Sequence, residues 1–285
     1  MIGQARPCIV GMQQGKKEWT PKRQNATTMS SPHLLAELLD NVTDHLHDTK
    51  DALRNCCLVS KSWIPRTRKH LFAEVRFEAM KDLESWKEIF PDPSTSPGHY
   101  TKSLLVHCLR TVDAADGEAG GWIRGFPRVE HFKLGCYDGL RFRTSLLSFR
   151  TFSPVLKSLH VEFVALPSLQ VFDLILSFPL LKDLAVINSY EIPADYDDDG
   201  SGGPPPIIQH SNPIKFTGTL TLLMLAGMEP IARRLLPVPS GMHFRALSLM
   251  WVHAADISLT RGLVERCSHT LESLDITCDP NGTSI

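Results

Sequence analysis

A six-residue motif returns along most of the chain, with the form apolar-x-x-apolar-x-apolar. Its copies begin at Phe72, Thr101, Val129, Leu156, Leu181, Leu220, Phe244 and Leu271. Most copies start about 24 to 29 residues after the previous one, a period typical of leucine-rich repeats. One such strand cannot bury its apolar face alone, but stacked copies share a continuous core. The motif therefore predicts an α/β fold, a short irregular leucine-rich-repeat solenoid with a parallel sheet. An ordinary α/β domain is the alternative.

Alternation within each copy separates side chains that point into the core from side chains that point outward. In "LKSLHV", for example, Leu159 and Val161 are expected to face inward. The predicted outward positions are His131, Lys133, Ser158, His160, Asp183, Ala185, Leu222, Met224, Ala246, Ser248, Ser273 and Asp275. The candidate target-binding residues among them are His131, Lys133, His160, Leu222 and Met224, the last two forming an apolar, adaptable patch. The alternative is that these positions pack against a loop.

The segment before the repeats has helical spacing. Ser31 is suited to cap a helix with Pro32 in its first turn. Apolar residues then follow at Leu35, Leu38, Leu39, Val42 and Leu46. Two further short helices are predicted, one ending near Val59 and one beginning around residues 62–65. A bundle of residues 31–73 has little core of its own, so we expect it to rest on a neighbour or a partner.

Composition shifts divide the chain into three regions. Residues 1–30 are polar and without periodicity, which predicts a disordered tail, and Met29 is a possible alternative start. The helical bundle of residues 31–73 follows, and the repeat domain takes residues 74–285. Within the repeat domain, residues 191–213 are acidic and rich in Gly and Pro, so they are expected to form a flexible insertion.

Charge and composition exclude several classes of protein. The 285 residues carry a formal net charge of -1, which gives no reason to expect nucleic-acid binding. No apolar run is long enough to cross a membrane, and the N-terminus does not predict a secretory signal. The seven cysteines are odd in number and form no CxxC pair. We interpret them as reduced thiols of an intracellular protein, cytoplasmic or nuclear.

Motifs for metal binding and catalysis are incomplete. "DYDDDG" at residues 195–200 begins like an EF-hand loop, but Pro206 occupies the position of the bidentate Glu. His45 and His47 lie two apart on a predicted helix, so they point to different faces. No phosphate-binding loop or nucleophile elbow occurs. We therefore expect no cofactor, no metal and no catalysis. A hydrolase with a Ser–His–Asp cluster in a cleft is the alternative from another functional class.

Residues 33–72 resemble the F-box, in the form common in mushroom-forming fungi. The positions that match the family pattern are Leu34, Glu37, Leu38, Leu39, Leu46, Leu58, Val59, Ser60 and Trp63. The last four belong to "LVSKSW", which is similar to the motif that ends the family's second helix. Leu35 stands where the family has Pro, a residue that sets the entry of the chain into the first helix. Irregular leucine-rich repeats are the usual second part of proteins in this family.

The resemblance implies a substrate-recognition subunit of a Skp–cullin–F-box ubiquitin ligase. In that family the bundle docks onto a Skp-type adaptor and through it onto cullin, and the repeats bind a target protein. The residues expected to contact the adaptor are Leu34, Leu35, Leu38, Val59 and Trp63, whereas Leu39 and Val42 are expected to face the bundle's own core. The alternative is a leucine-rich-repeat scaffold with a degenerate F-box and no link to a ligase.

Overall fold

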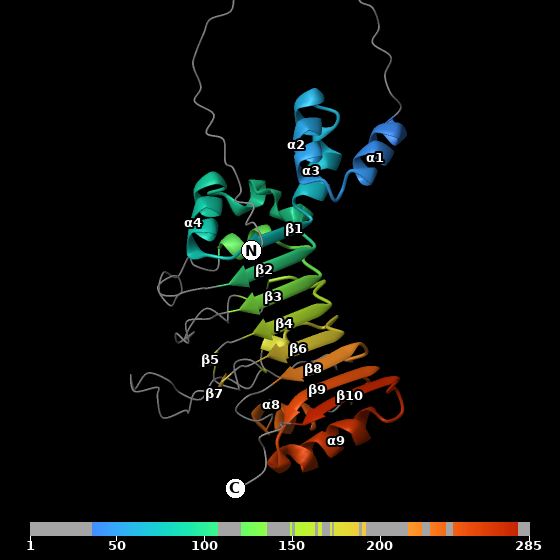
Figure 1. The fold of residues 1–285 in the computed structure, drawn as a ribbon. Helices are drawn as coiled ribbons and strands as arrows, with labels where there is room; N and C mark the ends of the chain where they lie inside the picture. The colour runs from blue at the N-terminus through green and yellow to red at the C-terminus, as the bar shows by residue number, and fades with distance from the viewer. Residues whose placement is uncertain are drawn as a thin grey trace, which may run out of the picture.

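The computed structural model describes residues 36–107, 121–135, 149, 152–162, 165–166, 172, 174–187, 190–191, 216–223, 229–237 and 242–278. Within them the chain is an α/β protein with one eight-stranded sheet, in which all strands are parallel and follow one another in chain order (Figure 1). The predicted parallel sheet is therefore confirmed. The predicted tail of residues 1–30 lies outside the described residues, as does nearly all of the insertion at 191–213.

Each of the eight motif copies in the sequence contributes one strand of the large sheet. The strands are β1 (Glu74–Phe77), β2 (Ser103–His107), β3 (His131–Gly135), β4 (Ser158–Glu162), β6 (Asp183–Ile187), β8 (Thr219–Leu223), β9 (Ala246–Val252) and β10 (Ser273–Cys278). A second, two-stranded sheet pairs β5 (Ala165–Leu166) with β7 (Tyr190–Glu191). The spacing of the motif copies therefore agrees with the spacing of the strands along the chain.

Helices lie at both ends of the sheet (Figure 1). Before β1 come α1 (Ala36–His45), α2 (Lys50–Val59) and α3 (Ile64–Leu71), and after it come α4 (Met80–Ile89) and the short 3-10 helices η1 (Pro93–Thr95), η2 (Pro97–Tyr100) and η3 (Trp122–Gly125). Near the other end lie α8 (Glu229–Leu235), η5 (Ala254–Asp256) and α9 (Ile257–Cys267). The three N-terminal helices sit beyond β1, so they extend the molecule at one end of the sheet.

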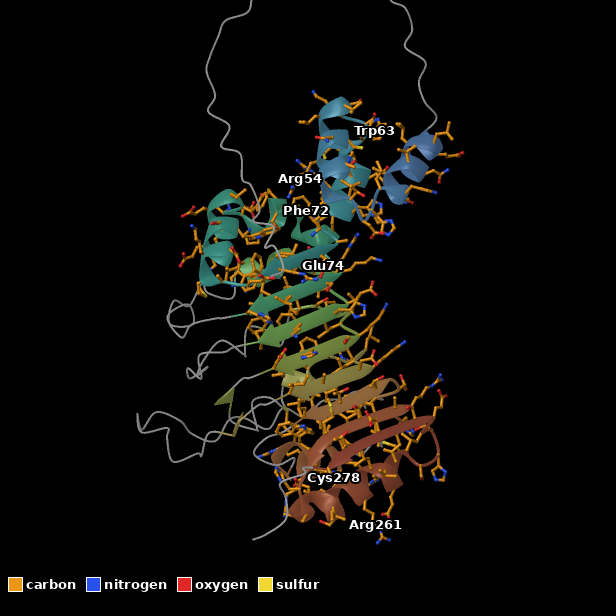
Figure 2. All side chains as sticks on the ribbon, viewed as in Figure 1. Arg54, Trp63, Phe72, Glu74, Arg261 and Cys278 are labelled. Atoms are coloured by element: carbon orange, nitrogen blue, oxygen red, sulfur yellow. The ribbon has the colours of Figure 1, made fainter. Side chains whose placement is uncertain are left out.

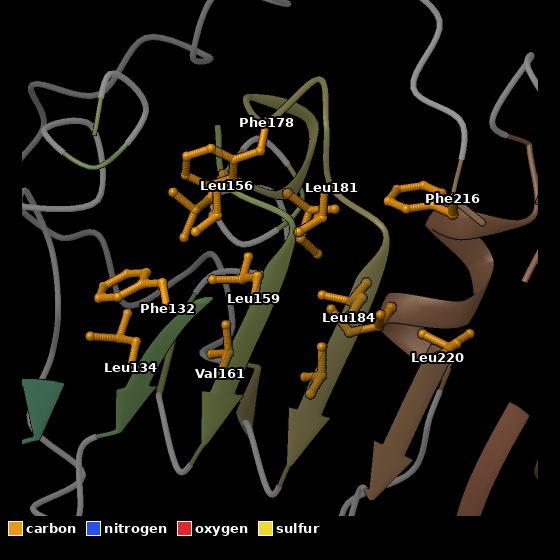
Figure 3. Packing of buried hydrophobic residues seen from close by; sticks show 14 of the residues in the cluster. Phe132, Leu134, Leu156, Leu159, Val161, Phe178, Leu181, Leu184, Phe216 and Leu220 are labelled. Atoms are coloured by element: carbon orange, nitrogen blue, oxygen red, sulfur yellow. The ribbon is translucent and has the colours of Figure 1, made fainter. Parts of the chain in front are cut away.

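Two rows of inward-facing side chains form the core of the sheet (Figure 3). The first row is Val75, Leu104, Phe132, Leu159, Leu184, Leu220 and Leu247, and the second is Phe77, Val106, Leu134, Val161, Val186, Leu222 and Leu249. All of these side chains are buried. Because the register places an apolar side chain beside its equivalent in the next strand, each motif copy completes the burial of its neighbours.

The predicted outward position of Leu222 is wrong. Leu220 and Leu222 are fully buried, and the side chains that face outward from β8 are Thr219, Thr221 and Leu223. The run "LTLLML" is apolar on either face, and the motif that starts at Leu220 is aligned three residues too late, because Leu220 rather than Leu223 pairs with Leu184. A shift by an odd number of residues exchanges the two faces of a strand. The observed register is supported by Asp183, whose carboxylate accepts a hydrogen bond of 2.7 Å from the backbone N–H of Thr219.

Two glycines come close together where η2 packs against η3. Gly98 and Gly125 are both buried, and a Cβ atom on Gly98 would overlap the carbonyl oxygen of Gly125. We expect Gly98→Ala to lower the free energy of unfolding by about 1–3 kcal/mol, because two backbone segments must separate. The measurement is urea unfolding followed by circular dichroism.

A matched control for this change is Gly262→Ala in α9. There the added carbon meets a methyl group of Leu236 at 3.2 Å, a contact that a flexible side chain relieves. Ala is also favoured over Gly inside a helix by about 1 kcal/mol. The control is therefore expected to keep or raise the stability, and equal stability of the Gly98→Ala protein and the parent would contradict the close packing of η2 and η3.

Candidate protein-interaction surfaces

A small apolar core holds α2 and α3 together. Leu53 and Cys56 of α2 are buried, and α2 packs against α3. The third helix begins directly after Trp63, with Pro65 in its first turn, where the missing N–H of proline costs no hydrogen bond. The hydroxyl of Thr67 donates a 2.7 Å hydrogen bond to the carbonyl of Trp63 and fixes this start. In Figure 2, Trp63 lies in the part of the bundle away from the sheet, and Phe72 lies where the bundle meets the sheet.

An ionic network ties α1 to α3. Arg66 donates from both Nε and Nη2 to the two carboxylate oxygens of Asp44, with 2.7 Å between Nε and Oδ1. His70 Nε2 lies 2.7 Å from the same Oδ1. The hydrogen bonds from Arg66 and His70 hold the pKa of Asp44 well below its ordinary value. The hydrogen bond to Asp44 likewise raises the pKa of Arg66. This network couples the position of α1 to the rest of the bundle.

The depressed pKa of Asp44 predicts how the bundle responds to acid. Since the pKa is lower in the folded chain than its ordinary value of about 4, the stabilisation is present above about pH 4 and is lost as the pH falls toward the folded value. We expect Asp44→Asn to lower the melting temperature at neutral pH, with a smaller difference in strong acid. Thermal melting by circular dichroism at several pH values measures this.

Asp48→Asn is the matched control, because Asp48 is highly exposed and its ion pair is with His47 at 3.1 Å. This change is expected to leave the melting temperature nearly unaltered, since exposed pairs contribute little. Equal melting temperatures for the Asp44→Asn protein and the parent at neutral pH would contradict a structural role for the network.

Two helices of the bundle each expose two aliphatic side chains, Leu38 and Val42 on α1 and Leu58 and Val59 on α2. We call these four residues together the bundle surface, and Trp63 follows them in sequence and is half-buried. The most exposed of them are Leu58, at 82%, and Val59, at 70%, which are the last two residues of α2. These two adjacent side chains leave apolar area in contact with water, and a partner that covered them would remove that area from water.

The five residues expected to contact an adaptor lie in different environments. Leu38 and Val59 are exposed and Trp63 is half-buried, whereas Leu34 and Leu35 lie outside the described residues. The prediction that Val42 faces the bundle core is wrong, because its side chain is about half exposed. Leu58 was not among the candidates, although its place at the end of the short second helix was a usable signal.

Charged groups gather on the outward face of β2, β3 and β4. Lys133 Nζ lies 2.5 Å from Glu162 Oε2, and His160 Nε2 lies 3.4 Å from the same oxygen. Burial lowers the pKa of His107 and of His160 below the ordinary value for histidine. Burial acts to raise the pKa of Glu162, but the hydrogen bond and charge of Lys133 lower it overall. This cluster presents an ordered, polar patch that includes two of the predicted target-binding residues.

The outward face becomes less polar toward β9. Paired positions on β6, β8 and β9 are occupied by Ile187, Leu223 and Met250, which are all partly exposed. The predicted patch of Leu222 and Met224 is not confirmed, because Leu222 is buried and Met224 lies outside the described residues. The predicted His131 is exposed on β3, beside the charged cluster. Together these residues form an outward face with a polar half and an aliphatic half.

Among the described residues, no group of three or more His, Cys, Asp or Glu side chains is arranged to hold a metal ion. The four cysteines in this part of the chain, Cys56, Cys57, Cys267 and Cys278, are free thiols. The "DYDDDG" segment lies outside it. Over the same residues, no helix is long and apolar enough to cross a membrane.

Searches against protein-family models, curated proteins and solved structures find no match for this chain.

Proposed function

We propose that the protein is the substrate-recognition subunit of a Skp–cullin–F-box ubiquitin ligase. In this proposal α1–α3 form an F-box bundle that binds a Skp-type adaptor and through it cullin. The sheet is a short irregular leucine-rich-repeat solenoid that binds a target protein. The chain itself supplies position rather than chemistry, because it holds the target near a ligase that carries out the transfer.

The observation that carries the proposal is the exposure of the bundle surface. "LVSKSW" resembles the motif that ends the second F-box helix, and its first two residues are the exposed Leu58 and Val59 at the end of α2. If these residues served only the bundle's own core, they would be expected to point toward Leu53 and be buried. An adaptor helix that packs over them would remove the exposed aliphatic area from water, at about 25 cal/mol per Å².

Support for the repeat half of the proposal comes from the strand order and from the outward face. The strands of the large sheet lie side by side in the order of the chain, as expected where each repeat contacts only its neighbours. The outward face is formed by alternate strand positions, whose side chains do not belong to the core of the sheet. His131, Lys133 and His160 are the proposed polar contacts with the target, and Leu223 takes the place of Leu222 as the proposed apolar contact.

Co-purification with a Skp-type adaptor tests the proposal. The full chain and the adaptor are co-expressed with a tag on the adaptor, beside a Leu38→Asp, Trp63→Ala double variant. Retention of the parent chain and loss of the variant are expected, since both substitutions alter the bundle surface. Absence of the folded parent chain from the purified adaptor would favour the second candidate, a repeat scaffold without a ligase link, which is suggested by Leu35 at the family's Pro position.

A further inference from the structure

One carboxylate oxygen on the outward face of β3 and β4 is shared by two basic side chains. Lys133 Nζ lies 2.5 Å from Glu162 Oε2, and His160 Nε2 lies 3.4 Å from the same oxygen. The side chains of Glu162 and His160 are 15% and 28% exposed, and the Nε2 atom itself is buried. A single anion therefore serves an ammonium group and an imidazole in a place with little access to water.

The strands that flank His160 supply one cation. Its register partner on β3 is Lys133, and its register partner on β6 is the uncharged Ala185. The carboxylate of Asp183, also on β6, accepts a 2.7 Å hydrogen bond from the backbone N–H of Thr219, so it is directed toward β8. Among the described groups that act on the charge of His160, the one carboxylate is therefore its neighbour on β4, Glu162.

A second histidine joins the cluster from β2. His107 is in register with Gly135, which is in register with Glu162. A Cβ atom on Gly135 would lie 2.6 Å from Cδ2 of His107, so the imidazole lies directly over the glycine. Burial and the charge of Lys133 lower the pKa of His107, whereas Glu162 and Glu78 act in the opposite direction. The strand β2 therefore adds another basic group to the cluster.

The charge balance of the cluster depends on pH. Burial, followed by the charge of Lys133, lowers the pKa of His160, so the ring is mostly uncharged at pH 7 and Lys133 balances Glu162. Protonation therefore occurs only as the pH falls below the ordinary histidine value of about 6.5. A proton on His160 would place a second positive charge beside an oxygen that Lys133 already binds. Lys133 is 34% exposed and has a flexible side chain, so it is the group that can move into water.

We propose that Lys133, His160 and Glu162 form an acid-sensitive switch, in which a proton on His160 displaces the Lys133 ammonium group from the Glu162 carboxylate. In mild acid the imidazolium binds Glu162 and Lys133 extends into solvent, so the outward face gains positive charge. The switch does not depend on binding to a ligase adaptor. Its effect on a target does rest on the proposed function, since Lys133 and His160 are proposed target contacts.

Histidine titration tests the first step. In the full chain with ¹³C-labelled histidine, the Cε1 chemical shift followed from about pH 8 to about pH 5 gives the pKa of each ring, and a His160→Asn spectrum assigns the signal. Lys133→Met is expected to raise the pKa of His160 by about one unit, because Glu162 then faces the imidazole alone. Glu162→Gln is expected to lower the pKa of His160, because the charge that favours the imidazolium is removed.

Lysine labelling tests the displacement. Reductive methylation of the full chain in neutral buffer and in mild acid, read by mass spectrometry, gives the labelling of Lys133 relative to the exposed Lys182. This ratio is expected to rise by about twofold or more in acid, as the population with a released ammonium group grows. His160→Asn is expected to abolish the rise, whereas the same change at His131, an exposed histidine on β3, is expected to keep it. Circular dichroism confirms that each variant is folded.

Two results would overturn the proposal. One is a labelling ratio that stays constant between the two buffers in the folded parent, or a rise that His160→Asn leaves unchanged. The other is a pKa of His160 that Lys133→Met does not raise, because Lys133 and His160 would then not compete for Glu162. Failure of the chain to bind a Skp-type adaptor alters neither readout.

Discussion

Replacing Val59 with Asp is expected to weaken binding of the chain to a Skp-type adaptor by about 100-fold or more. Val59 is 70% exposed at the end of α2, so the substitution leaves the bundle's own core intact. In the complex the same position would be covered by adaptor side chains, where a carboxylate without a partner costs several kcal/mol. About 2.7 kcal/mol corresponds to a hundredfold change in the dissociation constant. Calorimetric titration of the adaptor into the full chain measures the effect.

The matched control is Ile89→Asp. Ile89 is an aliphatic residue about half exposed at the end of α4, a different helix, and the charge change is the same. The Ile89→Asp protein is expected to bind the adaptor as the parent does. If both variants bind equally well, or both lose binding equally, Val59 does not lie in a specific interface.

Phe132→Ala is expected to lower the free energy of unfolding by about 3–5 kcal/mol, the range for truncation of a buried aromatic residue. Phe132 is 1% exposed and lies in the first core row between Leu104 and Leu159. Its ring centroid is 5.4 Å from that of Phe149 and 4.8 Å from that of Phe152. Truncation would remove contacts in both directions along the sheet and leave a cavity. Urea unfolding followed by tryptophan fluorescence measures the loss.

His131→Ala is the control, because His131 is the preceding residue and points to the opposite face of β3. Exposed substitutions of this kind usually change stability by less than about 0.5 kcal/mol. A small loss for Phe132→Ala, similar to that of the control, would contradict the continuous core on which the sheet depends.

The strands were predictable because one sequence pattern indicates both which side chains are buried and how far apart the strands lie along the chain. "LKSLHV" and "LESLDI" fix β4 and β10 to within two residues, since only one face of each is apolar. The failure at β8 has a physical cause. In "LTLLML" both faces carry leucine, and the register is decided by Thr219 and Thr221 together with the carboxylate of Asp183 from the previous strand. That contact is tertiary, and helix or strand periodicity carries no information about it.

The bundle surface was predictable in part. Helical spacing places Leu38, Leu39 and Val42 on one stripe, but it does not say which of them the other two helices cover. The answer depends on how α1 packs on the other helices, where Arg66 and His70 of α3 bind Asp44 of α1. Val42 is exposed in this arrangement, which helical spacing alone does not predict.

The exposure of Leu274 and Ile276 on β10 is not visible in the motif. Both residues follow the same pattern as the buried residues of β4 or β6, and the sequence alone gives them the same inward position. Among the described strands of the sheet, β10 stands last in the order and pairs with β9 alone, and these two side chains are exposed there.

Calorimetric titration of a purified Skp-type adaptor into the full chain is the most direct test of the central proposal. We expect a saturable 1:1 interaction for the parent and for Ile89→Asp, and loss of the signal for Val59→Asp. A flat titration with a parent chain shown by circular dichroism to be folded would contradict it, and the exposed residues at the end of α2 would then need another partner.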